Sequence, residues 1–256
     1  MSICWKPKII TNLDLQTNYF DELLSGKIPA IIVPKVLDQQ ECQVLVDRIM
    51  LNNEISIGLG STKKIGESIN SYISNKMEYF KNVKQSNHCL GKIFSHNDPR
   101  EKMLSVISGL SGKEIQFAKE KSLSYSKGMI RIYDPGDPVH VHRDNASFEA
   151  TNFSISTFSE QFSAVLHLQS ARYGGSLTVF DKIWTRSDEK FRDPEFGYSN
   201  DVIDGAFCTS ITCKQGDLVI INPNNYHIVN TVEGNLSRIT FGFFFGHGNS
   251  YLSAWS

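Results

Sequence analysis

The sequence lacks an excess of charge of either sign. Its 256 residues contain 26 Lys and Arg against 27 Asp and Glu, which leaves a formal net charge of -1 at pH 7. A protein that binds nucleic acid or an anionic surface through its charge carries a basic excess. The composition therefore gives no indication of a nucleic-acid partner.

Long apolar runs are also missing. No stretch has the length of about 20 apolar residues that a membrane-spanning helix needs. Residues 1–8 do not show the charged, apolar and small-residue order of a secretory signal. We therefore expect a soluble cytoplasmic protein with no membrane partner. The hydrophobic fraction of 40% is enough for a sizeable core in one domain.

Cysteine is scarce and has no pattern. The chain contains no Cys-x-x-Cys pair, and the odd number of cysteines argues against a disulfide framework and a structural zinc site. We expect reduced thiols, most of them packed in the core. They are Cys4, Cys42, Cys89, Cys208 and Cys213.

The two halves of the chain differ in their patterns. Up to about residue 120, helical spacing of apolar residues dominates. Asp38 and Glu41 have the spacing of a capping box, and the apolar residues that follow predict a helix over 38–51. Helical patterns also cover 65–80 and 100–110.

After about residue 121 the pattern changes to short strands, separated by turns rich in Gly, Pro and Asn. Strands are predicted at 128–133, 162–168, 176–180, 217–221, 227–231 and 238–245, with an earlier one at 28–33. Many short strands without regularly alternating helices are typical of an antiparallel jelly roll. The prediction is an α+β chain forming a single domain over 1–256, with a mainly helical lead-in (1–120) and a β-barrel core (121–250).

Candidate metal ligands lie in the stretch 139–145. His142 and Asp144 are two positions apart, so both side chains point to one face of an extended strand. A second imidazole, His227, follows in a later predicted strand. Two imidazoles and a carboxylate are the ligand set of mononuclear non-haem iron sites. His140 shares the strand face of His142 and competes with it for this role.

An arginine and a hydroxyl follow in the last predicted strand. Arg238 and Thr240 share one face of 238–245. Because an arginine fork binds a carboxylate through two hydrogen bonds, we interpret this pair as a clamp for a dicarboxylate cosubstrate. The alternate positions of the same strand are apolar and are expected in the core: Ile239, Phe241, Phe243 and Phe245.

Several other polar residues have two interpretations each. Arg131 and Tyr133 alternate on their strand, and they either face the pocket and contact cosubstrate or substrate, or point outward. Asn145 either contacts a ligand or substrate, or forms a turn. His167, inside an apolar strand, is expected to be a hydrogen-bonded wall residue and not a metal ligand.

Together these residues resemble the Fe(II)/2-oxoglutarate-dependent oxygenases, whose sites combine an H-x-D motif, a distal His and R-x-S/T. The likeness covers about 125–246 and includes Gly174-Gly175-Ser176-Leu177, which is similar to the family's G-G-x-L strand. Within the family, the run 110–132, that strand and Trp184 look most like the stand-alone small-molecule halogenases, of the welwitindolinone and free-amino-acid types, and their hydroxylase relatives.

The resemblance implies a double-stranded β-helix core with N-terminal helices packed against it. It implies that His142, Asp144 and His227 bind Fe(II), and that Arg238 and Thr240 bind 2-oxoglutarate. With O2, such enzymes release succinate and CO2 and oxidise an unactivated aliphatic C–H bond, here of a free amino acid or specialised metabolite.

The resemblance also bears on the reaction type. In the halogenases a small residue replaces the carboxylate ligand, and chloride takes the position it leaves. Asp144 fills that position here, so we expect hydroxylation, with desaturation or cyclisation as variants of the same oxidation.

Three other functions stay open. One is a prolyl-type protein hydroxylase of the same family. Another is a cupin-like metalloenzyme without 2-oxoglutarate, with His140 and His142 both as ligands. The spacing from Gly136 disfavours this, and a cupin would have no use for Arg238. The third is a non-catalytic jelly-roll binding module.

Where His142 is the ligand, His140 either supports the site or faces solvent. A homodimer is compatible with the sequence.

A long excursion, 182–207, joins two predicted core strands. Loops of this length in a compact domain often cover an active site, and an oxidising site needs protection from water. We expect either a lid or a simple cap on the end of the barrel. In a lid, Trp184, Arg186 or Tyr198 would help to cover the substrate.

Overall fold

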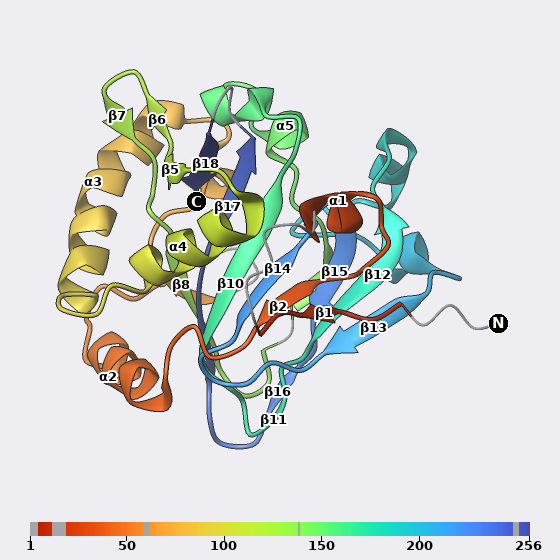
Figure 1. Ribbon diagram of the computed structural model, residues 1–256. Helices are drawn as coiled ribbons and strands as arrows, with labels where there is room; N and C mark the ends of the chain where they lie inside the picture. Colours follow the sequence, from red (N-terminus) through yellow and green to blue (C-terminus); the bar gives the residue numbers. More distant parts are fainter. Residues whose placement is uncertain (1–4, 12–18, 59–61, 138, 248–250) are drawn as a thin grey trace.

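The computed structural model describes residues 5–11, 19–58, 62–137, 139–247 and 251–256. Two β-sheets face each other, and helices cover the outer side of the larger sheet (Figure 1). This is the double-stranded β-helix arrangement expected from the sequence. Cys4 and part of the N-terminal segment 1–8 lie outside the described residues.

The larger sheet consists of β1 (Lys8–Ile9), β2 (Ile31–Val33), β14 (Leu218–Ile221), β10 (Phe162–Gln169), β17 (Arg238–His247), β8 (Met129–Tyr133), β4 (Lys63–Ile65) and β3 (Ser56–Ile57), in that spatial order. Two further strands, β18 (Leu252–Trp255) and β5 (Ile115–Phe117), extend it beyond β17. The smaller sheet has the order β13 (Cys208–Ile211), β12 (Leu177–Ile183), β15 (Asn225–Val229) and β9 (Val139–His142). The described residues also form two separate antiparallel pairs: β6 (Lys119–Glu120) with β7 (Leu123–Ser124), and β11 (Tyr173–Gly174) with β16 (Val232–Glu233).

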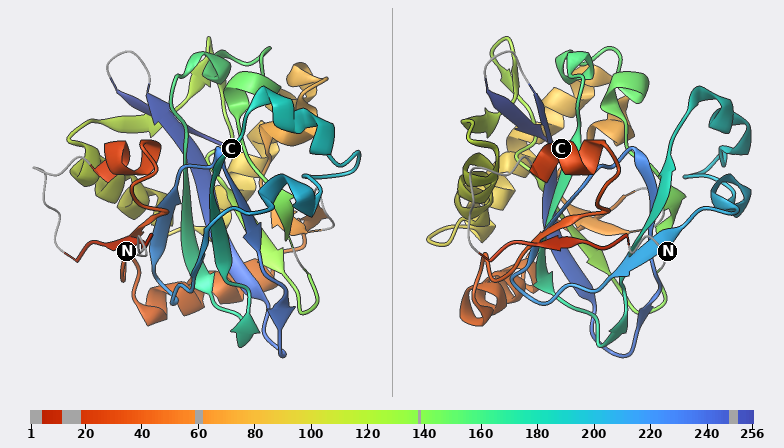
Figure 2. Two further views of the ribbon diagram at one scale, coloured as in Figure 1. Left: turned by 90° about the vertical axis from the view of Figure 1, so that its right-hand side faces the viewer. Right: turned by 45° about the vertical axis from the view of Figure 1, so that its right-hand side comes forward.

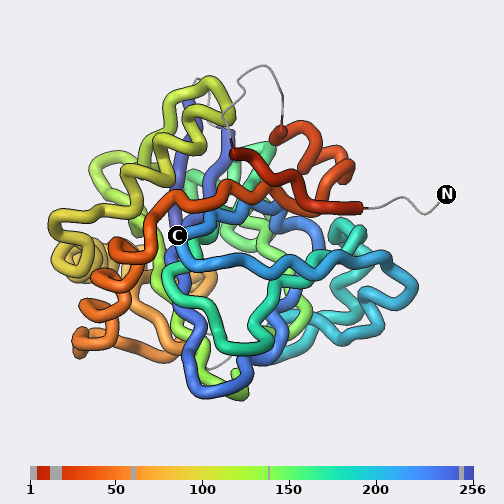
Figure 3. The backbone as a smooth tube through the Cα atoms, turned by 60° about the horizontal axis from the view of Figure 1, so that its bottom comes forward, coloured from red at the N-terminus to blue at the C-terminus, as the bar shows by residue number. Residues whose placement is uncertain are grey.

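The helices are α1 (Tyr19–Leu24), α2 (Gln39–Met50), α3 (Lys76–Ile93), α4 (Pro99–Ser111) and the short α5 (Ala146–Glu149). Among the described residues, the 3-10 turns are η2 (Ile69–Tyr72), η3 (Ser154–Thr157), η4 (Arg186–Phe191) and η5 (Asn200–Ile203). Helices α2, α3 and α4 gather on one side of the molecule (Figures 1 and 3). None of the helices in the described ranges has both the length and the apolar character for crossing a membrane.

The capping box predicted for the second helix is present. The Asp38 side chain accepts a hydrogen bond from the Glu41 backbone N–H at 2.8 Å, and the Glu41 carboxylate accepts one from the Asp38 N–H at 3.0 Å. These two bonds satisfy amide groups that a helix start leaves without partners. The helix buries Leu45 and Ile49 against the larger sheet.

The main core lies between the helices and the outer face of the larger sheet. Strand β17 contributes the predicted apolar positions to it: Ile239, Phe241, Phe243 and Phe245 are all buried there. The other face of the same strand points toward the smaller sheet. Figure 2 shows the two sheets facing each other from further sides. The side chains between the sheets form the site described below.

One helix prediction is wrong in part. Residues 65–80 do not form a continuous helix: Ile65 ends a strand, and α3 begins only at Lys76 and continues to Ile93. Gly66 explains the break, because its φ is 118° and a Cβ there would lie 2.8 Å from the Gly128 carbonyl oxygen. The first half of the chain therefore supplies strands to the larger sheet as well as helices.

The described cysteines are free thiols. Cys42, Cys89 and Cys213 are buried, as expected for packing residues, whereas Cys208 is exposed. Burial raises the pKa of the Cys42 thiol to about 11, so it stays protonated at neutral pH.

Candidate active site

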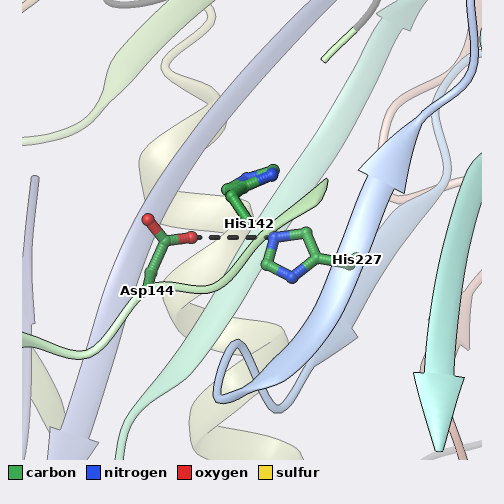
Figure 4. A group of neighbouring side chains, drawn as sticks. All are labelled: His142, Asp144 and His227. Carbon is green, nitrogen blue, oxygen red and sulfur yellow. Dashed lines mark ion pairs between the residues drawn. The ribbon is translucent and has the colours of Figure 1, made fainter. Parts of the chain in front are cut away.

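The structure brings together the two histidines and the carboxylate predicted as metal ligands. His142 ends β9, and His227 lies directly opposite it in β15. Asp144 follows β9 by two residues. One ligand atom from each of the three lies within 4.8 Å of the others, and all three face one point (Figure 4). Among the described residues, this is the group of His, Cys, Asp or Glu side chains that lie close enough together to hold a metal ion.

Backbone carbonyls orient both imidazoles. The His142 Nδ1 lies 2.8 Å from the His140 carbonyl oxygen, and the His227 Nδ1 lies 2.9 Å from the Asn225 carbonyl oxygen. Because a carbonyl only accepts, each Nδ1 carries the proton and donates it. Each Nε2 therefore keeps its lone pair for a metal ion.

Burial also keeps both imidazoles neutral. It lowers the pKa of His142 and of His227 from 6.5 to about 4, and the nearby charge of Arg131 adds to the effect. Neutral imidazole is the form that binds a metal, so neither histidine must lose a proton at neutral pH before it can act as a ligand.

The Asp144 carboxylate is held more loosely. Its backbone N–H donates to the Pro223 carbonyl at 2.9 Å, and one carboxylate oxygen, Oδ1, accepts from the Asn70 side-chain amide at 3.4 Å. The other oxygen, Oδ2, lies 3.7 Å from the His227 Nε2 (Figure 4). Two nitrogens and one oxygen on one side of a point, with the other side open, fit Fe(II).

Arg238 lies at the other end of the site. It is only 4% exposed, and its Nε has no hydrogen-bond partner among the described residues. Its guanidinium lies 5.0 Å from the centre of the Tyr133 ring, which sits opposite it in the β17–β8 register. A buried guanidinium without a carboxylate partner fits the far carboxylate of 2-oxoglutarate. Gly175 leaves room for it, since a Cβ there would lie 3.1 Å from the Arg238 Cδ.

A cavity of about 150 Å³ joins the two ends of the site. Strands of both sheets line it, and the predicted residues Arg131, Tyr133, His142, Asp144, His227, Arg238 and Thr240 all contribute. Val165, Val219 and Ile221 add an apolar wall. The cavity is therefore polar where the predicted ligands lie and apolar beside them.

The structure also shows where His167, the predicted wall residue, and His140, the competing ligand, lie. His167 lines the cavity and is 4% exposed, but its imidazole has no hydrogen bond to any described residue, so that detail of the prediction is wrong. His140 is exposed, which agrees with a solvent-facing rim residue.

The four predicted substrate residues do not line this cavity. Asn145 caps α5, where its side chain accepts a hydrogen bond from the Phe148 N–H. Arg186 is exposed. The indole of Trp184 and the hydroxyl of Tyr198 both donate to Glu189, at 2.7 Å in each case, and neither residue lines the cavity.

Several cavity residues were not predicted from the sequence, among them Phe196, Lys64 and Asn70. Phe196, in the 182–207 excursion, has its ring centre 5.3 Å from that of His142. Lys64 and Asn70 line the cavity from the first half of the chain. Asn70 lies within 65–80, the segment for which the sequence predicts a helix, and Lys64 directly precedes it. The turn residues Gly66 and Asn75 were the available indication of a different structure.

Comparison with known proteins agrees with this geometry. The family described as carrier-protein-independent halogenase WelO5 matches residues 9–254. Leucinostatins biosynthesis cluster protein S of Purpureocillium lilacinum is 29% identical over 185 residues, which are 68% of this chain and 74% of that protein. The L-γ-glutamyl-L-propargylglycine hydroxylase of Streptantibioticus cattleyicolor is 22% identical over 248 residues, 93% of this chain and 92% of that protein.

Solved structures share the fold. An N-substituted L-amino acid dioxygenase from Burkholderia ambifaria AMMD, in complex with α-ketoglutarate (2-oxoglutarate), has a TM-score of 0.63 at 17% identity over 93% of this chain and 90% of that one. HygX from Streptomyces hygroscopicus, with nickel and 2-oxoglutarate bound, has a TM-score of 0.55 at 12% identity over 90% of this chain and 87% of that one.

The family match spans nearly the whole chain, and the site holds the donors that Fe(II) requires. The chain therefore belongs to the carrier-protein-independent halogenase WelO5 family of Fe(II)/2-oxoglutarate-dependent oxygenases.

Proposed function

We propose that the enzyme hydroxylates an unactivated aliphatic C–H bond of a small molecule. The observation that carries this proposal is the Asp144 carboxylate, whose Oδ2 lies 3.7 Å from the His227 Nε2. A halogenase of this family is expected to have a small residue there, which leaves a metal position for chloride. The carboxylate occupies that position, so the chain is built to transfer oxygen.

The site residues then have separate roles. His142, Asp144 and His227 hold Fe(II). Arg238 binds the far carboxylate of 2-oxoglutarate, and Thr240, which lies two residues along the same face, adds a hydroxyl. When bound, the metal and cosubstrate supply the oxidation, in which one atom of O2 enters the substrate and the other enters succinate while CO2 leaves.

The remaining contribution of the protein is orientation and shielding. Tyr133 is 6% exposed and covers one side of Arg238, which keeps water away from the guanidinium. The apolar wall formed by Val165, Val219 and Ile221 excludes water beside the cavity. Water exclusion strengthens the charge interactions that position the cosubstrate.

Both the size of the cavity and the names of the similar proteins favour a small substrate. The volume of about 150 Å³ has to hold the cosubstrate as well as the substrate, which favours a compact substrate. The Streptantibioticus relative is named as a hydroxylase of a γ-glutamyl amino acid, and the Burkholderia structure is an N-substituted amino acid dioxygenase. Amino acids and their derivatives are therefore the substrates to test. The four free cysteines of the described chain support a cytoplasmic location.

The test is a product analysis in chloride buffer. The enzyme is incubated aerobically with Fe(II), 2-oxoglutarate and chloride, and a panel of free and N-substituted amino acids is scored for succinate release. Each active compound is then analysed by mass spectrometry. We expect the gain of one oxygen atom. A chlorinated product from the wild-type enzyme would contradict the proposal.

A further inference from the structure

A row of polar side chains crosses the larger sheet inside the cavity. Lys64 lies directly opposite Arg131, Arg131 opposite Thr240, and Thr240 opposite His167. Residues directly opposite each other on paired strands point to the same face. All four line the cavity, so the row runs across its floor over β4, β8, β17 and β10. The last three of these strands lie side by side in Figure 1.

Two members of this row are neighbouring cations. Like charges directly opposite each other on paired strands destabilise a sheet. Lys64 is only 8% exposed, and its Nζ has one acidic neighbour, Glu67, at 3.4 Å. Arg131 has no side-chain hydrogen bond or ion pair with any described residue. An anion between the two cations would relieve their repulsion.

The cavity lining as a whole also has an excess of positive charge. Its lining carries three cations, Lys64, Arg131 and Arg238, against one anion, Asp144. Bound Fe(II) and 2-oxoglutarate carry equal and opposite charges, so their binding leaves this excess unchanged. Glu67, just outside the lining, offsets one charge. One positive charge remains for a further anionic group.

We propose that Lys64 and Arg131 bind a carboxylate of the substrate. The substrates are then small carboxylic acids, such as amino acids, N-substituted amino acids or short peptides with a free carboxyl group. This inference rests on the proposed function, because it assigns the substrate to the same cavity. Arg131 was expected to contact either cosubstrate or substrate, and its pairing with Lys64 assigns it to the substrate.

The position of the pair suits a substrate beside the metal ligands. Arg131 lines the same cavity as His142, Asp144 and His227, and it lies opposite Thr240 in the β17–β8 register. Asn70, Ser71 and Thr62 line the same cavity and offer hydrogen bonds to the rest of the substrate. A carboxylate on the pair would therefore hold the adjoining carbon chain close to the metal site.

The test compares acids with their amides. The enzyme is loaded with Ni(II) and 2-oxoglutarate, which prevents turnover, and its melting temperature is measured with the proteinogenic L-amino acids and their N-acetyl derivatives, each as the acid and as the primary amide. We expect at least one acid to stabilise the protein while its amide does not. Equal stabilisation by the amides, or no stabilisation by any acid, would overturn the proposal.

Variants locate the binding site. The dissociation constant of the best acid should rise about tenfold or more in Lys64→Gln, because a charged hydrogen bond is lost. Lys63→Gln is the matched control. Lys63 directly precedes Lys64 on β4, points to the opposite face of the sheet and forms an ion pair with Asp134 at the surface. It should bind the acid like the wild type. Unchanged affinity in Lys64→Gln, or an equal loss in both variants, would refute the assignment.

Two further measurements separate this inference from the proposed function. In Lys64→Gln, the affinity for 2-oxoglutarate should stay within about twofold of the wild type, since Arg238 holds the cosubstrate. A tenfold loss there would assign the pair to the cosubstrate. If the Ni(II) enzyme binds acids through Lys64 but the Fe(II) enzyme forms no hydroxylated product, the proposed function fails and the carboxylate site stands. If the Fe(II) enzyme hydroxylates amides as fast as acids, the proposed function stands and the carboxylate site fails.

Discussion

The residues of the metal site differ in how firmly the fold holds them. Each imidazole is oriented by a backbone carbonyl two residues before it, at 2.8 Å for His142 and 2.9 Å for His227. From the described residues, the Asp144 carboxylate accepts one hydrogen bond, donated by the Asn70 side-chain amide at 3.4 Å. Of the three ligands, Asp144 is therefore the one whose substitution should least disturb the positions of the other two.

Replacing this carboxylate tests the reaction type at the residue scale. In Asp144→Gly, Fe(II) affinity should fall at least about tenfold, because one of three ligands is lost, and hydroxylation should be lost with it. Any chlorination in chloride buffer should appear only in this variant. Metal titration and product mass spectrometry measure both effects.

The control for this prediction is Asp181→Asn, which changes an exposed carboxylate on β12 and should leave both quantities unchanged. If Asp144→Gly hydroxylated at the wild-type rate, Asp144 would not be a ligand.

Arg238 is expected to act on the cosubstrate alone. In Arg238→Gln the KM for 2-oxoglutarate should rise about 10-fold to 100-fold, because a charged hydrogen bond contributes about 1.5–3 kcal/mol. At saturating 2-oxoglutarate, kcat should change much less. Arg172→Gln, which alters an exposed arginine stacked on Tyr173, is the control. An unchanged KM in Arg238→Gln would assign the cosubstrate to other residues.

At the scale of elements, Arg143 joins the 182–207 excursion to β9. It stands between His142 and Asp144 in the sequence, yet its side chain points away from the cavity and is fully buried. Its guanidinium lies 4.2 Å from the centre of the Trp184 ring, and it forms ion pairs with Glu149 at 3.4 Å and with Glu189 at 3.3 Å. The excursion is therefore fastened next to the end of β9, between His142 and Asp144.

A glycine brings the same excursion close to β9. Gly197 has a φ of 78°, and a Cβ there would lie 2.3 Å from the Val141 carbonyl oxygen. The close approach places the neighbouring Phe196 against His142. We expect the excursion to cover the metal site through Phe196, with Trp184 and Tyr198 as its anchors on Arg143.

Removing the anchor should destabilise the protein. In Arg143→Met the carboxylates of Glu149 and Glu189 lose a buried partner, and the free energy of unfolding should fall by about 3 kcal/mol. Urea unfolding monitored by circular dichroism measures the change. Arg186→Met, in the same excursion but exposed, should change it by less than about 0.5 kcal/mol. Equal stability of the two variants would show that Arg143 does not hold the excursion.

Local patterns predicted some elements well and others poorly. The helix beginning after Asp38 and the alternation in β17 depend on neighbours in the sequence, and both are confirmed. The three-residue strand β4 is too short to show a pattern, and its pairing with β8 depends on residues far away in the chain. The same limit applies to Lys64, whose role follows only from the register that places it opposite Arg131.

For the molecule as a whole, the two faces of the larger sheet have different tasks. The outer face packs on helices, and the inner face buries ionisable groups around the cavity. The H-x-D motif, the distal histidine and Arg238 could be found from the sequence because residue types and spacing carry them. The substrate contacts could not, because long-range packing decides which side chains of the 182–207 excursion reach the cavity.

Buried imidazoles should make the stability of the metal-free protein depend on pH. Burial lowers the pKa of His142 and His227 to about 4, and it lowers that of His167 well below 6.5. In the unfolded chain these groups bind protons near pH 6.5. The unfolded state therefore holds more protons below this pH, and stability should fall as the pH drops from about 6.5 toward 4.

Urea unfolding of the metal-free protein at several pH values tests this expectation. His167→Gln should show a shallower fall than the wild type, because one of the buried imidazoles is gone. Gln keeps a polar side chain at the cavity wall. The same slope in both proteins would mean that His167 is not held neutral by the fold.

The most direct test of the account is an anaerobic titration of the metal-free enzyme with Fe(II) and then 2-oxoglutarate. Chelation of Fe(II) by the keto acid end of 2-oxoglutarate produces a visible charge-transfer absorption. We predict that this band forms in the wild type, needs more 2-oxoglutarate in Arg238→Gln, and is absent in His227→Ala. A wild-type enzyme that binds Fe(II) and develops no such band would contradict the assignment of the site.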